Sequence, residues 1–145
     1  MIRVEGEVAK PTTFDFAALA ALPQQVADVG SMVPGKQGGA VRLRALLEAA
    51  GAKPSAQFAT LEGDGGKFAV SVPLAAVADN AVVAYRLGDA ALPDKQGGPA
   101  RFYILDVKSC GDASGVDACA NVKRLSRIKL TREREPDVGH WHEGS

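Results

Sequence analysis

The sequence predicts an α+β domain with mixed sheets and a few short helices. Short strand-like runs recur along the chain, helical periodicity is confined to brief stretches, and the two do not alternate in the β-α-β order of a doubly wound parallel sheet. The chain has 145 residues, about the size of one domain. We expect this domain to span residues 1–135, and we expect residues 136–145 to form a polar tail on its surface.

Strands are expected where apolar residues alternate with polar ones, or form short runs, between turn-forming residues. These runs lie at residues 2–8, 25–29, 57–61, 67–72, 81–87, 101–107 and 122–130. The glycine-rich residues 62–66 separate two of the runs and are typical of a β-hairpin. Most of the regular structure is therefore predicted to be β-sheet.

The clearest helix is expected at residues 42–50. Leu43, Leu46 and Leu47 follow the spacing that gives a helix one apolar face. Gly51 comes directly after this helix and is the residue type that most often follows a helix end, because glycine adopts a left-handed backbone without a steric penalty.

Two shorter helices are expected on either side of this one. Residues 14–22 follow Thr13, which we expect to cap the helix N-terminus, with Asp15 in the first turn. Residues 74–78 follow Pro73, a residue that suits the first turn of a helix. Both helices are predicted to be short because turn-forming residues or strands border them closely.

Glycine and proline divide the rest of the chain into loops at residues 30–41, 93–99 and 108–120. The sequence Lys-Gln-Gly-Gly occurs in the first loop, at residues 36–39, and again in the second, at residues 95–98. Because the flanking residues do not match and no longer period repeats, we interpret this echo as chance and not as an internal repeat.

Composition argues against several classes of function. Lys and Arg total 17, Asp and Glu also total 17, and aromatic residues make up 6%. A nucleic-acid-binding domain would carry a basic excess, and a single-strand binder would carry aromatic stacking platforms. No apolar run approaches the roughly 18–20 residues of a membrane-spanning helix. We therefore expect no nucleic-acid partner and no membrane span; the expected partner is a small-molecule ligand or a protein.

Six short motifs occur in a fixed order along nearly the whole chain. They are V-x-G-x-V-x-x-P at residues 4–11, L-x-x-L-P at 19–23, V-x-L-x-x-L-L-x-x-A-G at 41–51, D-G-G followed by P-L at 64–74, L-P-x-x-x-G-G-P-x-R at 92–101 and V-K-x-L-x-R-I-x-L-T at 122–131. Together they resemble the molybdopterin-binding oxidoreductase domain of the sulfite oxidase family. Residues 135–141, E-P-D-V-G-H-W, are similar to the E-P-G-x-W end of some bacterial members. The resemblance implies an α+β fold that holds a pterin-bound molybdenum.

The resemblance also implies a cysteine thiolate that binds the metal, on the loop before the V-x-L-x-x-L-L helix. In this chain that loop is residues 30–35, it contains no cysteine, and Ser31 or Met32 stands in the corresponding place. The tryptophan that usually follows the loop is replaced by Gly39 and Ala40. A neutral thioether or hydroxyl is a weaker ligand than a thiolate for an oxidised metal.

We therefore expect a non-catalytic binding or scaffold module with no bound cofactor, and molybdopterin is the cofactor that the resemblance would allow. The alternative is a molybdenum-dependent oxidoreductase that transfers oxygen atoms, passes electrons to a carrier and uses an atypical metal ligand. In that case Ser31 or Met32 would lie at the metal.

Two basic residues match positions that line the cofactor pocket in the family. Arg101 follows G-G-P, and Lys123 is the lysine of V-K-x-L. Both side chains suit the phosphate of a pterin cofactor, arginine through two parallel hydrogen bonds. The alternative is that both are solvated cations at strand ends. A pterin would need a cavity of roughly 300 Å³ or more between residues 30–41 and the strands that carry the two cations.

Cys110 and Cys119 are the only cysteines, and they flank a polar loop that a disulfide would hold together. The alternatives are two unrelated thiols, a thiol that reaches the molybdenum position, and a metal or redox site, including zinc bound together with His140 and His142. A disulfide would fit a periplasmic or secreted protein. The first residues lack the pattern of a signal peptide, so a cytoplasmic protein is the alternative unless a leader was removed.

Overall fold

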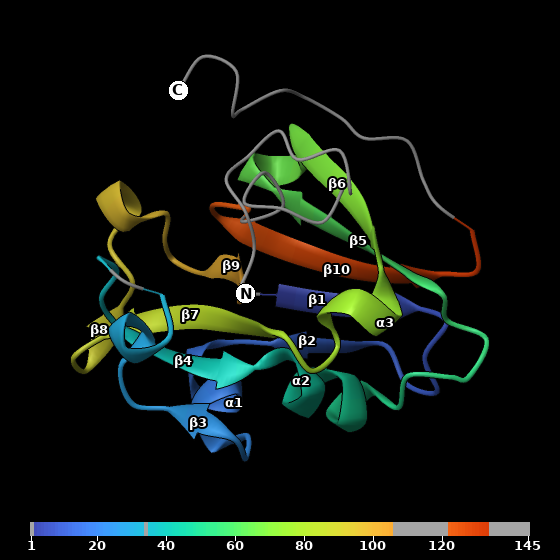
Figure 1. Cartoon of the computed structure of the whole chain (residues 1–145), viewed down its shortest axis with the longest axis horizontal. Coiled ribbons are helices and arrows are strands. Elements are labelled where there is room, and N and C mark those ends of the chain that lie inside the picture. Colours follow the sequence, from blue (N-terminus) through green and yellow to red (C-terminus); the bar gives the residue numbers. More distant parts are fainter. Residues whose placement is uncertain (1, 34, 106–121, 134–145) are drawn as a thin grey trace.

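The computed structural model of the chain describes residues 2–33, 35–105 and 122–133. Within these residues, two five-stranded sheets enclose the main hydrophobic core, and short helices lie beside them (Figure 1). This arrangement confirms the predicted α+β class with mixed sheets and short helices. The expected tail, residues 136–145, lies outside the described residues.

The first sheet has the strand order β2-β1-β10-β5-β6. Its strands are β1 (Ile2–Gly6), β2 (Thr12–Phe14), β5 (Phe58–Gly63), β6 (Phe68–Pro73) and β10 (Leu125–Thr131). β1 and β10 run parallel, with Arg3 opposite Arg127, and every other neighbouring pair in this sheet is antiparallel. β5 and β6 form the predicted hairpin around the short 3₁₀ turn η2 (Asp64–Gly66).

The second sheet is built around β7 (Ala81–Leu87), which pairs antiparallel with three other strands. The remaining strands are β3 (Gln25–Val26), β4 (Gly39–Arg42), β8 (Ala90–Ala91) and β9 (Arg101–Ile104). β3 pairs with β4, and β9 follows the 3₁₀ turn η3 (Asp94–Gln96).

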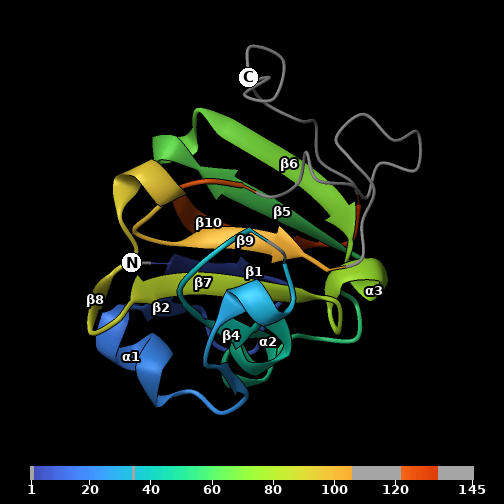
Figure 2. The same cartoon turned by 60° about the vertical axis from the view of Figure 1, so that its left-hand side comes forward.

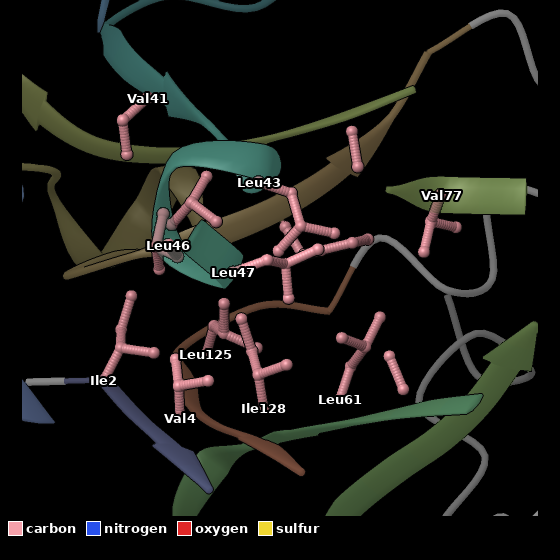
Figure 3. Close-up of a cluster of buried hydrophobic side chains, with 14 of the residues drawn as sticks. Ile2, Val4, Val41, Leu43, Leu46, Leu47, Leu61, Val77, Leu125 and Ile128 are labelled. Atoms are coloured by element: carbon pink, nitrogen blue, oxygen red, sulfur yellow. The ribbon is translucent and has the colours of Figure 1, made fainter. Parts of the chain in front are cut away.

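The helix α2 (Leu43–Ala50) packs its apolar face against the core between the sheets. Its buried leucines are those that the sequence predicts: Leu43, Leu46 and Leu47. Figure 3 shows them facing apolar side chains of the first sheet, among them Val4 and Ile128. Gly51 ends the helix with a left-handed backbone at φ 73°, as predicted. The helix α3 (Leu74–Val77) follows Pro73, also as predicted.

The strands β4, β7 and β9 of the second sheet contribute buried side chains on both faces. In β9, Phe102 and Ile104 belong to the main core, whereas Tyr103 belongs to a smaller apolar cluster on the outer face. The segment between β3 and β4, with the 3₁₀ turn η1 (Val29–Ser31), covers this outer face (Figure 2). Because successive side chains of a strand alternate between faces, Arg101 shares the outer face with Tyr103.

The helix α1 (Phe16–Ala21) has a different N-cap from the predicted one. Thr13 lies in strand β2, opposite Arg3, so the expectation that it caps the helix is wrong. Asp15 is the N-cap, and its carboxylate accepts a hydrogen bond from the Ala18 backbone N–H at 2.8 Å. A cap must stand directly before the helix for its side chain to reach that N–H, and Asp15 does so.

Residues 30–41 are not entirely a loop, because β4 begins at Gly39. Gly39 lies opposite Arg86 of β7, and a Cβ atom at Gly39 would stand 2.5 Å from the Arg86 guanidinium carbon. The glycine here therefore makes room for a neighbouring side chain within a strand. In the sequence, such a glycine cannot be told from a glycine in a loop. None of the helices in the described residues is long and apolar enough to cross a membrane.

Candidate functional site

A basic cavity of about 240 Å³ lies on the outer face of the second sheet. Three segments that are distant in the sequence form it: residues 35–37, η3 and β9. Its lining residues are Gly35, Lys36, Gln37, Lys95, Arg101 and Tyr103. Three of these side chains are cationic and none is acidic, so the described lining favours an anionic ligand.

Arg101 is the most constrained cation of the cavity. Its guanidinium carbon lies 4.9 Å from the centre of the Tyr103 ring, within the range of a cation–π contact. Its Nε atom is buried and makes no hydrogen bond to the part of the chain that the structure describes. A buried, charged N–H without an acceptor is costly, so an acceptor oxygen that reached this atom would remove an unfavourable feature of the site.

The pKa values of two lining residues reflect this environment. The pKa of Lys36 is lowered, first by burial and then by the positive charges of Arg101 and Lys123. Burial raises the pKa of Tyr103, and the neighbouring Arg101 opposes part of that increase. The cations are thus close enough to repel one another, and a bound anion would relieve this repulsion.

The structure places Lys123 beside Arg101, although Lys123 is exposed and is not a lining residue of the cavity. A Cβ atom at Gly97 would lie 2.7 Å from Cδ of Arg101 and 3.1 Å from Cγ of Lys123. The aliphatic parts of the two side chains therefore converge at Gly97, where a larger residue would collide with them. The backbone holds this arrangement, because Phe102 N–H donates to the Val122 carbonyl at 3.0 Å.

Lys36 and Lys95 are cavity residues that the sequence analysis does not single out. They belong to the two Lys-Gln-Gly-Gly segments, at residues 36–39 and 95–98, and both segments contribute to this one cavity. Gly38 and Gly97 occupy equivalent places in the two segments, and both have positive φ, 116° and 91°. The echo in the sequence is therefore the signal that could have identified these two lysines.

Ser31 and Met32 are not among the residues that line the cavity. The Ser31 hydroxyl donates to the Asp28 carbonyl at 2.8 Å within the turn η1. Met32 is half-buried and packs against the small outer cluster that contains Tyr103. The structure thus brings together Arg101 and Lys123 of the four expected site residues, and it places the other two in the segment that supports the cavity.

The four residues of the alternative zinc site, Cys110, Cys119, His140 and His142, lie outside the described residues, and so does the expected disulfide. In the part of the chain that is described, no group of three or more His, Cys, Asp or Glu side chains is arranged to hold a metal ion.

The family described as "oxidoreductase molybdopterin binding domain" matches residues 35–141, a range that contains Arg101 and Lys123 but begins after Ser31 and Met32. Among curated proteins, no sequence matches the chain.

The chain is also similar in structure to the sulfane dehydrogenase SoxCD from Paracoccus pantotrophus, with a TM-score of 0.65 and 24% sequence identity. The similarity covers 92% of this chain and 38% of the SoxCD chain, so this chain spans well under half of that protein. At this level of identity the likeness concerns the fold alone.

Proposed function

Because this chain belongs to the oxidoreductase molybdopterin-binding domain family, we propose that it is a non-catalytic binding module whose basic cavity holds the phosphate end of a pterin-type ligand. One observation carries the proposal. Arg101 lines the cavity together with Lys36 and Lys95, and its buried Nε makes no hydrogen bond within the described residues. A phosphate brings both the acceptor oxygens and the negative charge that this group of cations needs.

The size of the cavity determines which part of a ligand fits. Its volume is about 240 Å³, below the roughly 300 Å³ at which pockets for whole cofactors begin. The described residues therefore fit a phosphate group with the atoms next to it, and the rest of the ligand would extend beyond them. Arg101, Lys36 and Lys95 would hold the phosphate, and Lys123 would add to the positive field from the side of Gly97.

The chemistry at the family's metal position supports a non-catalytic role. In this family the pterin carries molybdenum, which supplies oxygen-atom transfer. The segment where a thiolate is expected offers the Ser31 hydroxyl, which donates to the Asp28 carbonyl, and the Met32 thioether, which packs in the outer cluster. Both side chains already serve the fold of the turn η1, and both are neutral, so neither supplies the anionic donor that an oxidised metal prefers.

A molybdenum-dependent oxidoreductase with an atypical ligand is the second candidate. Membership of a family of oxidoreductase domains favours it. It requires Ser31 or Met32 to leave its present contacts and approach the metal.

Calorimetric titration with inorganic pyrophosphate tests the proposed cavity. We expect wild-type protein to bind and Arg101→Met to bind about tenfold or more weakly, because the variant loses a charge-assisted contact in a partly buried site. Arg44→Met is the matched control, because Arg44 is a surface arginine of α2 and is not part of the cavity. Equal affinity of Arg101→Met and wild type would overturn the assignment.

Metal and pterin analysis separates the two candidate functions. Protein purified from a molybdenum-replete host should carry no stoichiometric molybdenum if the module is non-catalytic. About one molybdenum per chain would support the oxidoreductase instead. The variant Met32→Cys places a thiol at this position. If this variant binds molybdenum and the wild type does not, the wild-type site lacks only the side chain that binds the metal.

A further inference from the structure

We propose that Arg124 and Asp94 are positioning residues for the anion site, which hold Lys95 and Lys123 around Arg101. This inference rests on the proposed function, because it concerns how the same cavity achieves its affinity. Neither residue lines the cavity. The proposal starts from an unusual backbone conformation next to Lys123.

Arg124 has a left-handed backbone with φ 49°. A side chain with a Cβ atom is strained in this region, so the surrounding contacts must hold the conformation in place. Such strain is often found beside functional groups, where it fixes the direction of a neighbouring residue. Here the neighbour is Lys123, whose Cγ atom lies against Gly97, as does Cδ of Arg101.

Arg124 also holds both ends of the turn η3. Its side chain forms a two-point ion pair with Asp94, the first residue of η3, with Nε–Oδ1 at 2.7 Å and Nη2–Oδ2 at 3.1 Å. Its backbone N–H donates to the carbonyl of Gly97, directly after η3, at 2.7 Å. Lys95 lies between these two attachment points, so the position of its backbone is set by Arg124.

A third contact connects Arg124 to the hairpin of the first sheet. Its carbonyl accepts a hydrogen bond from the backbone N–H of Asp64 at 3.1 Å, and its Nη1 lies 3.7 Å from the Asp64 carboxylate. The two lysines are thereby tied to a rigid sheet and are not left on a free loop. This matters because a cation that is held in place loses less conformational entropy when the anion binds.

The exposure of the Arg124–Asp94 ion pair indicates that the pair positions the anion site and contributes little to the stability of the whole fold. The Asp94 side chain is 73% exposed and the Arg124 side chain 42%, and exposed ion pairs contribute little to the free energy of folding. The hydrogen bond from Arg124 also lowers the pKa of Asp94, so the pair persists at pH values well below neutral.

The test compares two similar ion pairs. Asp94→Asn and Arg124→Lys disrupt the proposed positioning pair. Asp79→Asn and Arg44→Lys disrupt a matched pair, Arg44–Asp79, which has the same two-point geometry with both contacts at 2.8 Å but lies away from the cavity. We expect affinity for inorganic pyrophosphate to fall about threefold to tenfold in the first set and to stay at the wild-type value in the second.

Two further measurements distinguish positioning from a merely structural role. Arg124→Gly accepts the left-handed backbone without strain, so its unfolding transition should not move to lower urea, yet its affinity should fall. In a Lys95→Met background, Asp94→Asn should have a smaller effect than in the wild type, because part of its action passes through the lost lysine.

The outcomes separate this inference from the function on which it rests. If wild type does not bind pyrophosphate, or Arg101→Met binds as well as wild type, the proposed function fails. If Arg101→Met loses affinity while Asp94→Asn behaves like Asp79→Asn, only the positioning role fails. The positioning role would also be contradicted if Asp94→Asn lowered the affinity for pyrophosphate equally in the wild type and in the Lys95→Met background.

Discussion

Single polar atoms in the interior show how one residue can influence this fold. Thr60 of β5 is 2% exposed, and its hydroxyl oxygen makes no hydrogen bond among residues 2–33, 35–105 and 122–133. Tyr85 of β7 is buried to the same degree, but its hydroxyl donates to Oε1 of Gln25 at 2.6 Å. A buried hydroxyl group without a hydrogen-bond partner destabilises a fold, whereas a buried hydroxyl group with such a partner contributes modestly to stability.

Opposite effects are therefore expected at these two positions. Thr60→Val replaces the unpaired hydroxyl with a methyl group of similar size and should raise the free energy of unfolding by up to about 1 kcal/mol. Tyr85→Phe removes a satisfied hydrogen bond and should lower it by about 1 kcal/mol. Urea unfolding followed by fluorescence and circular dichroism measures both changes, and a destabilised Thr60→Val would contradict the account.

The site residues differ in how far the sequence could identify them. Arg101 and Lys123 follow recognisable motifs, and the structure places them side by side at Gly97. Lys36 and Lys95 are marked by the repeated Lys-Gln-Gly-Gly segments but are missed, because the echo alone does not say that the two loops pack on one sheet. The roles expected for Ser31 and Met32 stay predictions, because nothing in the described contacts tests them.

At the scale of elements, periodic segments are predicted well and borders less well. The leucines of α2 and the hairpin β5–β6 follow local rules of spacing and turn chemistry, and both are present as expected. β4 is missed because Gly39 reads as a loop residue, although the glycine makes room there for Arg86. The predicted start of α1 is wrong because Thr13 and Asp15 are both good N-cap residues. Thr13 pairs with Arg3 in an edge strand, and the local sequence does not show this pairing.

The two candidate caps of α1 can be compared directly. Asp15→Ala removes the hydrogen bond to the Ala18 N–H and should lower the free energy of unfolding by about 1 kcal/mol. Thr13→Ala should have a smaller effect, because the Thr13 hydroxyl makes only an exposed contact with Arg3 at 3.2 Å. Urea denaturation of the two variants checks the order, and a larger loss for Thr13→Ala would contradict the assigned cap.

At the scale of the whole molecule, exposed ion pairs give stability a weak dependence on pH, because each pair contributes little to the free energy of folding. The pKa values of Glu7, Asp79 and Asp94 are all lowered, in each case mainly by a hydrogen bond from an arginine: Arg132, Arg44 and Arg124 respectively. A carboxylate with a lowered pKa in the folded state binds its proton less readily than in the unfolded chain. Its contribution to stability is complete above the unfolded pKa of about 4 and is lost as pH falls through the lower folded value.

We therefore expect the free energy of unfolding to be nearly constant above about pH 5 and to fall at more acidic pH. The triple variant Glu7→Gln, Asp79→Asn, Asp94→Asn should show a shallower fall, and molar salt should reduce the difference between variant and wild type by screening these exposed pairs. Urea titrations at a series of pH values measure this dependence. Identical acid profiles for the variant and the wild type would show that other groups control the transition.

The parallel pairing of β1 with β10 has a consequence for how the protein is made. Among the described strands β1 leaves the ribosome first and β10 last, yet the two are neighbours in the sheet, with Arg3 opposite Arg127. Until β10 emerges, β1 and the finished hairpin β5–β6 have no strand to join them, and their apolar faces stay open to water and to other nascent chains. The strands of the second sheet all precede β10, so that sheet can form first, whereas the first sheet is completed only after β10 has been synthesised. In the interval between these two events, chaperones have the open faces of β1 and the hairpin to protect.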